Sequence, residues 1–251
     1  MSEVLIVTGT GTGVGKTVVT AALAAVARAR GDRVAVVKPA QTGADTGAQG
    51  RDPPDVDTVR RLAGVTDTHE LARFPDPLSP EAAARVTGLP PLDMHAAAGY
   101  VIKLAEARDL VLVEGAGGLL VRYDPAGTTI ADLAVALRAP VLVVAAASLG
   151  TLNHTALTCE ALAARRITNK GVVIGSWPRD PGLAELANLA DLEAVAGEPL
   201  AGLLPEGSGM LGRDEFLAVA LGGLGPRLGG SWAVAGRSAG RRGEARGRSG
   251  K

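Results

Sequence analysis

The sequence predicts an α/β fold in which helices cover both faces of a parallel β-sheet. Short apolar stretches alternate along the chain with longer stretches of helical periodicity. The apolar stretches lack alternating polar residues, as strands do when both faces of their sheet are buried. Apolar residues make up 47% of the chain and aromatic residues only 2%. Small aliphatic side chains must therefore fill the core, which lets helices pack closely on the sheet.

In the first half of the chain, three runs of Val, Leu and Ile predict buried strands at residues 4–8, 34–38 and 110–113. Pro39 should close the second strand, because proline has no N–H group to donate. Ser79 and Asp93 should be the N-cap residues of two helices. The expected helices are residues 16–30, residues 55–63, one that begins at Ser79-Pro80-Glu81, and one from Asp93 to residue 107.

The same alternation continues in the second half. Strands are expected at residues 140–146, 171–174 and 200–204, and helices at residues 130–137, 151–165 and 182–196. Because the carboxyl ends of parallel strands meet at one edge of the sheet, the segments that follow the strands are candidates for a binding site.

Charge divides the chain into a single domain, residues 1–225, and a basic Gly/Ser/Arg-rich tail, residues 226–251. Residues 227–251 contain seven basic residues and one acidic residue, a net charge of +6. The whole chain has a formal charge of zero, which leaves −6 for the body. An acidic body argues against nucleic-acid binding. The tail is expected to be disordered, with weak contact to nucleic acid or a membrane surface as the alternative.

Cysteine usage and hydropathy predict a cytoplasmic protein that does not bind membranes. The single cysteine, Cys159, cannot form an intrachain disulfide, which suits a reducing compartment. The first apolar run is short and enters a glycine-rich segment, unlike a signal peptide. No apolar stretch is long enough to span a bilayer.

The strongest motif is the run Thr8-Gly9-Thr10-Gly11-Thr12-Gly13-Val14-Gly15-Lys16-Thr17 between a strand and a helix. Such a loop points backbone N–H groups at phosphate, Lys16 can reach the β- and γ-phosphates, and Thr17 can offer its hydroxyl to Mg²⁺. Thr10 stands where the usual pattern has its first glycine. The motif predicts a P-loop NTPase-like fold that binds nucleotide through Gly13, Val14, Gly15, Lys16 and Thr17.

Two further strand ends carry charge. Glu114, in Glu114-Gly115-Ala116-Gly117-Gly118, follows the third strand and could bind a metal beside the phosphates. Lys38, in Lys38-Pro39-Ala40-Gln41-Thr42-Gly43, could hold a γ-phosphate and an acidic substrate together. Alternatively, Glu114 caps a loop and Lys38 is a surface residue at a strand end.

With Leu149-Gly150-Thr151-Leu152-Asn153-His154-Thr155, these three motifs resemble the dethiobiotin synthetase family over residues 3–222. The resemblance implies an ATP-dependent ligase of biotin biosynthesis. Such an enzyme joins CO₂ to 7,8-diaminopelargonic acid as a carbamate, phosphorylates the carbamate with ATP, and closes a cyclic urea with release of ADP and phosphate. This chemistry requires phosphate positioning, a metal and cations, but no nucleophilic side chain.

The resemblance also implies roles for individual residues. Lys16 would contact the phosphates, and Thr12 and Lys38 would flank the carbamate and γ-phosphate as catalytic residues. Mg²⁺ would be held by Thr17, Asp55 and Glu114, with Asp52 and Asp57 as alternatives to Asp55. The substrate would also be bound by Thr42, by the backbone of Ala116 and Gly117, and by Gly150, Thr151, Leu152 and Asn153 of the partner subunit in a homodimer with shared active sites.

The nucleobase is expected to lie against Ser176, Trp177, Pro205, Glu206 and Gly207. Much of the family has an asparagine after the matching strand, where this chain has Gly175-Ser176-Trp177-Pro178. Serine cannot make the paired contact of an amide with adenine, so weak base selectivity is expected. Trp177 could stack on any base or only pack over the end of the sheet.

Three other functions can be weighed against the sequence, and each fits it less well. A glutamine-dependent amide ligase would need a second domain that 251 residues leave no room for. A dimerising ATPase switch of the chromosome-partitioning type carries an extra lysine early in the loop, where this chain has Gly11. A phosphotransferase would have no use for Lys38 beside Gly117.

Overall fold

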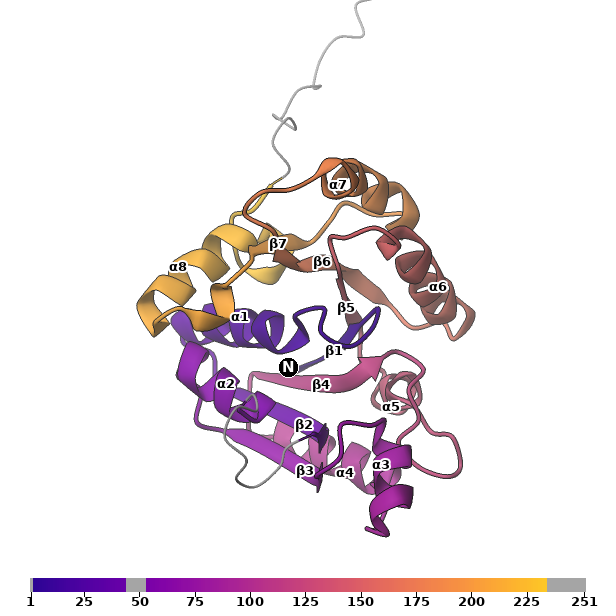
Figure 1. Cartoon of the computed structure of the whole chain (residues 1–251). Helices are drawn as coiled ribbons and strands as arrows, with labels where there is room; N and C mark the ends of the chain where they lie inside the picture. The colour runs from indigo at the N-terminus through magenta and orange to yellow at the C-terminus, as the bar shows by residue number, and fades with distance from the viewer. Residues whose placement is uncertain (1, 44–52, 234–251) are drawn as a thin grey trace, which may run out of the picture.

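The computed structural model describes residues 2–43 and 53–233. In this part of the chain seven parallel strands form one sheet in the order β3-β2-β4-β1-β5-β6-β7 (Figure 1). The strands are β1 (Glu3–Gly9), β2 (Val34–Thr42), β3 (Thr68–Phe74), β4 (Leu110–Gly118), β5 (Val141–Ala145), β6 (Asn169–Trp177) and β7 (Gly202–Pro205).

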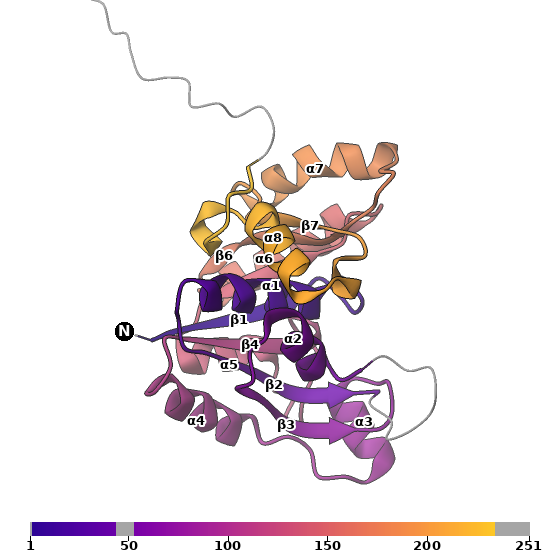
Figure 2. The ribbon, with the colours of Figure 1, turned by 90° about the vertical axis from the view of Figure 1, so that its left-hand side faces the viewer.

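Helices cover both faces of the sheet (Figure 2). One face packs against α1 (Lys16–Ala29), α2 (Asp55–Ala63) and α8 (Arg213–Gly223). The other face packs against α3 (Pro80–Thr87), α4 (Met94–Ala105), α5 (Ile130–Leu137), α6 (Thr151–Ala164) and α7 (Leu183–Ala196). Two short 3₁₀ helices, η1 (Ser208–Met210) and η2 (Pro226–Leu228), flank α8.

Successive residues of each central strand enter opposite cores. In β1, Ile6 packs toward α5, while Leu5 and Val7 pack toward α1. All three are almost fully buried, which explains why the strands read as continuous apolar runs. The predicted α/β fold, a P-loop NTPase-like parallel sheet with helices on both faces, is confirmed.

The second strand does not end at Pro39, as the sequence suggested, but continues to Thr42. The N–H group of Val36 donates to Asp67 O on the β3 side, so Pro39, three residues later, faces β4 because strand positions alternate. Pairing between β2 and β4 ends at Val37. The N–H group that proline lacks is therefore not needed there.

Four elements were not expected from the sequence: β3, α8 and the two 3₁₀ helices. Residues 226–233, assigned to the tail, instead pack on α8: the N–H groups of Ser231 and Trp232 donate to Leu221 O and Leu224 O, at 2.7 and 2.9 Å. The remainder of the expected tail and Asp52 lie outside the described residues. No helix within residues 2–43 and 53–233 is long and apolar enough to cross a membrane.

Candidate active site

The loop between β1 and α1 lies against the end of β6. Gly15 has a φ of +94°, and a Cβ atom on it would lie 2.6 Å from Gly175 O. A Cβ atom on Gly175 would lie 2.1 Å from Val14 O. Two glycines thus permit a backbone-to-backbone approach that no other residue allows. The loop therefore leaves the end of β1, passes against the end of β6 and leads into the start of α1.

Lys16, the first residue of α1, is buried with 7% of its surface exposed. Its Nζ donates to Gly11 O at 2.8 Å, so the side chain folds back over its own loop. Burial, assisted by the charge of Lys38, lowers the pKa of Lys16 to about 8. The loop therefore contains a poorly solvated cation, which an anion would stabilise.

A second cation, Lys38, lies between two carboxylates. Its Nζ is 2.5 Å from Asp55 Oδ2 and 2.9 Å from Glu114 Oε1, and Thr17 Oγ1 donates to the same Glu114 oxygen at 2.8 Å. The group joins α1, β2, α2 and β4 at the carboxyl edge of the sheet. Lys38 and Glu114 are almost completely buried, while Asp55 is partly exposed. We refer to Thr17, Lys38, Asp55 and Glu114 as the Lys38 cluster.

The charges in the cluster are interdependent. Burial alone would lower the pKa of Lys38, but the charges of Glu114 and Asp55 outweigh it and raise that pKa. Burial raises the pKa of Glu114 despite the nearby ammonium. For Asp55, the attraction of Lys38 outweighs burial, so its pKa is lowered. Lys38 therefore remains a cation at neutral pH, and Asp55 is its more firmly ionised partner.

The position of Asp55 distinguishes it from Asp57. Asp55 begins α2, and its N–H group donates to Gln41 Oε1 of β2 at 3.0 Å, which ties the helix start to the strand end. Asp57 points to the surface, where it pairs with Arg60 at 2.7 Å. Of these two aspartates, the structure brings only Asp55 to the Lys38 cluster.

Beyond Glu114, strand β4 approaches both lysine-bearing segments. Lys38 Nζ donates to Gly115 O at 3.2 Å. Gly117 has a φ of +67°, and a Cβ atom on it would lie 3.7 Å from Thr12 Oγ1. The predicted neighbours Thr12, Lys38 and Gly117 are thus gathered at one edge.

One buried residue near this edge was not expected from the sequence. The N–H group of Ala116 donates to Tyr123 Oη at 2.6 Å, so this backbone donor already has an acceptor. Burial raises the pKa of Tyr123, which keeps the phenol neutral. The available signal was weak: Tyr123 is one of only two tyrosines in the chain and follows a glycine-rich strand end.

A pocket of about 230 Å³ opens beside the loop. It is lined by Gly13, Val14, Ala146, Ala147, Ser148, Ser176, Pro178, Glu185 and Glu206. The structure thus brings Ser176 and Glu206 to the phosphate loop. Trp177 is half-buried and packs against the core instead, beyond a shift in the register of β6 with β7 between Ile174 and Trp177. Pro205 and Gly207 are exposed on either side of Glu206.

The segment Gly150–Asn153 begins α6 next to this pocket rather than in the Lys38 cluster. Gly150 has a φ of +94° at the helix N-cap, and Thr151 Oγ1 donates to Ala146 O at 2.7 Å. Leu152 is half-buried and Asn153 is exposed. Thr42 is half-buried at the end of β2 beside β3.

Comparisons with known proteins show the family to which the chain belongs. A sequence model described as an AAA domain matches residues 3–210. The ATP-dependent dethiobiotin synthetase BioD of Frankia casuarinae is 62% identical over 91% of this chain and 94% of its own length. The chain belongs to the dethiobiotin synthetase family. The enzyme of the same name from Streptomyces avermitilis is 59% identical over 92% of this chain and 95% of its own length.

The chain shares its fold with more distant ATPases. The cell-division ATPase MinD of Pyrococcus furiosus covers 88% of the chain and 90% of its own length, with a TM-score of 0.55 and 20% identity. A ParA family ATPase from Chlorobium tepidum covers 88% and 97%, with a TM-score of 0.57 and 12% identity. At these identities the likeness concerns the fold alone. The family relatives identify the chain as an ATP-dependent ligase of biotin biosynthesis.

Proposed function

We propose that this dethiobiotin synthetase carboxylates 7,8-diaminopelargonic acid with CO₂ and closes the ureido ring with ATP at the carboxyl edge of the sheet. The observation that carries this proposal is the placement of Lys38 at the end of β4, on the same Glu114 oxygen as Thr17 and close enough to Lys16 to add to the effect of burial in lowering its pKa. A buried ammonium there can neutralise a carbamate and a γ-phosphate, two anions that otherwise repel each other. Lys16 would hold the β- and γ-phosphates, and Thr12 and Gly117 would flank the reacting groups.

The oxygen atoms around Lys38 fit a divalent cation. Thr17 Oγ1 and Glu114 Oε1 lie 2.8 Å apart, and both carboxylates of the Lys38 cluster already contact a cation, the lysine ammonium. Among the described residues no group of three or more His, Cys, Asp and Glu could hold a metal alone. Mg²⁺ commonly uses one or two carboxylates and completes its shell with phosphate and water oxygens. We propose that Thr17, Asp55 and Glu114 hold Mg²⁺, which would neutralise phosphate charge.

Coupling between substrates tests the proposed reaction. ADP release should require ATP, Mg²⁺, bicarbonate and the diamine together, because phosphate transfer needs the carbamate as acceptor. The assay measures ADP while each component is omitted in turn. ADP release at the full rate without the diamine would contradict the proposal, and release that instead depends on DNA or a protein would favour an ATPase switch.

We also propose that the active unit is a cytoplasmic homodimer, with residues 1–225 of each chain as one domain against which residues 226–233 pack. Exposed Asn153 at the start of α6 would bind the distal carboxylate of the substrate in the site of the partner subunit. An equal mixture of inactive Lys16→Ala and Asn153→Ala chains, exchanged between subunits, should regain about a quarter of wild-type activity as fully functional shared sites form. A mixture of Lys16→Ala and Lys38→Met chains is the matched control, because both substitutions damage the same half-site. Equal recovery in both mixtures, or an active monomer by light scattering, would refute the shared site.

Nucleobase selectivity should be weak. Ser176 faces the pocket where a family asparagine would offer an amide to adenine, and Trp177 is turned toward the core. We expect kcat/KM for CTP and GTP to lie within about a hundredfold of that for ATP, the scale of one lost base contact. Ser176→Asn should then raise the preference for ATP by about tenfold. A wild-type preference far beyond a hundredfold would mean that another group recognises adenine.

A further inference from the structure

The peptide that joins Gly115 to Ala116 lies outside the regular ladder of the sheet. Strand β4 pairs with β2 only as far as Val113. Its register with β1 then shifts, from Val7 opposite Glu114 to Gly9 opposite Gly118. Between these pairs, one residue of β1 lies opposite three residues of β4, which is a bulge of the kind often found beside active sites. The polar groups of the Gly115–Ala116 peptide therefore need partners other than neighbouring strands.

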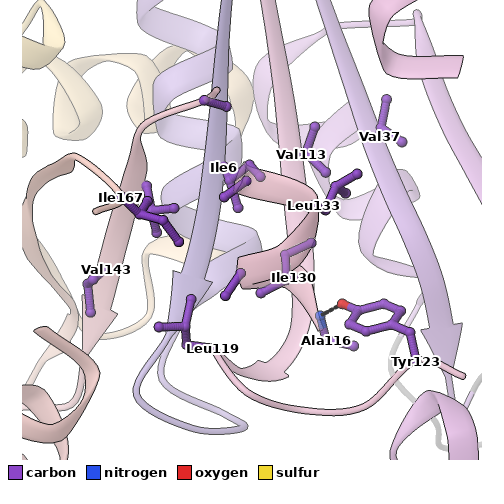
Figure 3. Packing of buried hydrophobic residues seen from close by; sticks show 14 of the residues in the cluster. Ile6, Val37, Val113, Ala116, Leu119, Tyr123, Ile130, Leu133, Val143 and Ile167 are labelled. Carbon is purple, nitrogen blue, oxygen red and sulfur yellow. Dashed lines mark hydrogen bonds between the residues drawn. The ribbon is translucent and has the colours of Figure 1, made fainter. Parts of the chain in front are cut away.

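Two side chains supply these partners, one on each side of the peptide. The Gly115 carbonyl accepts a hydrogen bond from Lys38 Nζ at 3.2 Å. The N–H group of Ala116, which belongs to the same peptide unit, donates to Tyr123 Oη at 2.6 Å. Figure 3 shows the Tyr123 ring lying alongside β4 with its hydroxyl directed at Ala116. The chain of donors and acceptors thus runs from the Lys38 ammonium through the peptide to the phenol oxygen.

We propose that Tyr123 is a positioning residue that fixes the Gly115–Ala116 peptide and, through its carbonyl, the Lys38 ammonium. Consecutive hydrogen bonds polarise one another, so a bond at the Ala116 N–H group strengthens the Gly115 carbonyl as an acceptor. The carbonyl is the neutral partner of Lys38, whereas Asp55 and Glu114 are also proposed to hold Mg²⁺. The inference rests on the proposed role of Lys38 in the reaction.

The surroundings of Tyr123 suit this role. Its side chain is fully buried, and its N–H group donates to Thr128 O at 2.8 Å, which anchors the loop that carries it. Without the hydroxyl, the Ala116 N–H group would be buried with no acceptor, an arrangement that proteins avoid. The peptide would then turn to find another partner, and the Gly115 carbonyl would move away from Lys38.

Tyr123→Phe tests the proposal. We expect kcat to fall by about tenfold, the factor that corresponds to one misplaced hydrogen bond, while the affinity for a non-hydrolysable ATP analogue stays within about twofold. Tyr123→Leu should show the same loss of kcat with a lower melting temperature, because it also removes the ring. Tyr100→Phe is the matched control. It removes the other tyrosine hydroxyl, which lies on α4 and is hydrogen-bonded to His69 Nδ1 of β3 at 2.9 Å, and it should leave kcat unchanged.

Three outcomes would overturn the proposal. The first is a Tyr123→Phe enzyme with wild-type kcat. The second is an equal loss of kcat in Leu133→Ala, a core variant on α5 that lowers stability but removes no hydrogen-bonding group. The third is rapid hydrogen exchange at the Ala116 amide of the wild-type protein, a measurement that needs no variant. Lys38→Met, assayed in parallel, separates the role of Lys38 from the role of Tyr123. Full activity of Lys38→Met would reject the role of Lys38. Loss of activity in Lys38→Met together with normal turnover in Tyr123→Phe would reject only the role of Tyr123.

Discussion

Lys16→Ala should lower kcat/KM by about a thousandfold or more, with little change in the melting temperature. The activity should fall because phosphoryl transfer depends on charges already in place around the phosphates, and the neighbouring ammonium of Lys38 is committed to two carboxylates. Stability should be retained because the ammonium of Lys16 is buried, and its lowered pKa means that the folded protein disfavours its charge.

The measurement pairs steady-state kinetics with thermal unfolding for both proteins. Lys103→Ala, which removes an exposed lysine of α4, serves as the control and should match the wild type in both. Turnover near the wild-type rate in Lys16→Ala would refute the assignment of the phosphate loop.

Lys38→Met should lower kcat by about a hundredfold while nucleotide affinity changes by only about fivefold or less. The reason is that Lys38 acts on the charge that arises where carbamate and γ-phosphate meet, and not on the nucleotide alone. Binding of a non-hydrolysable ATP analogue, measured beside kcat, separates the two effects. Weakened nucleotide binding with an intact kcat would place Lys38 on the wrong ligand.

The same substitution has a predictable effect on the fold. It leaves Glu114 buried opposite Asp55 without a cation, and a buried charge without its partner is destabilising. The double variant Lys38→Met/Glu114→Gln removes one of the two carboxylate charges and should recover part of the lost melting temperature. It should not recover kcat, which separates the structural role of Lys38 from its chemical role.

Much of the fold follows from the sequence because its central strands are buried on both faces. Strand β3 was missed because it is an edge strand of half-buried polar and apolar residues, stabilised by pairing with β2 rather than by its own composition. The early end assigned to β2 was wrong because the effect of Pro39 depends on where β4 stops pairing, which is a property of the sheet.

The candidate site could be predicted where short motifs fix local geometry. Strand ends and a glycine-rich loop were enough to suggest that Lys16, Lys38 and Glu114 would meet, since parallel strands end at one edge. Tyr123 could not be predicted, because its role depends on the bulge in β4, and no periodicity reveals a bulge. The direction of Trp177 likewise depends on the register of β6 against the core.

The central claim is that ATP phosphorylates a carbamate made from CO₂ and the diamine, and isotopic oxygen tests it directly. In this reaction a carbamate oxygen bonds to the γ-phosphorus as the bond to ADP breaks. The second amine then attacks the carbamate carbon, and phosphate leaves with that oxygen. With ¹⁸O-labelled bicarbonate and the diamine, mass spectrometry of the released phosphate should find one labelled oxygen, in proportion to dethiobiotin formed. Unlabelled phosphate released at the full rate would show that water accepts the phosphoryl group, and the proposed phosphorylation of a carbamate at this site would be wrong.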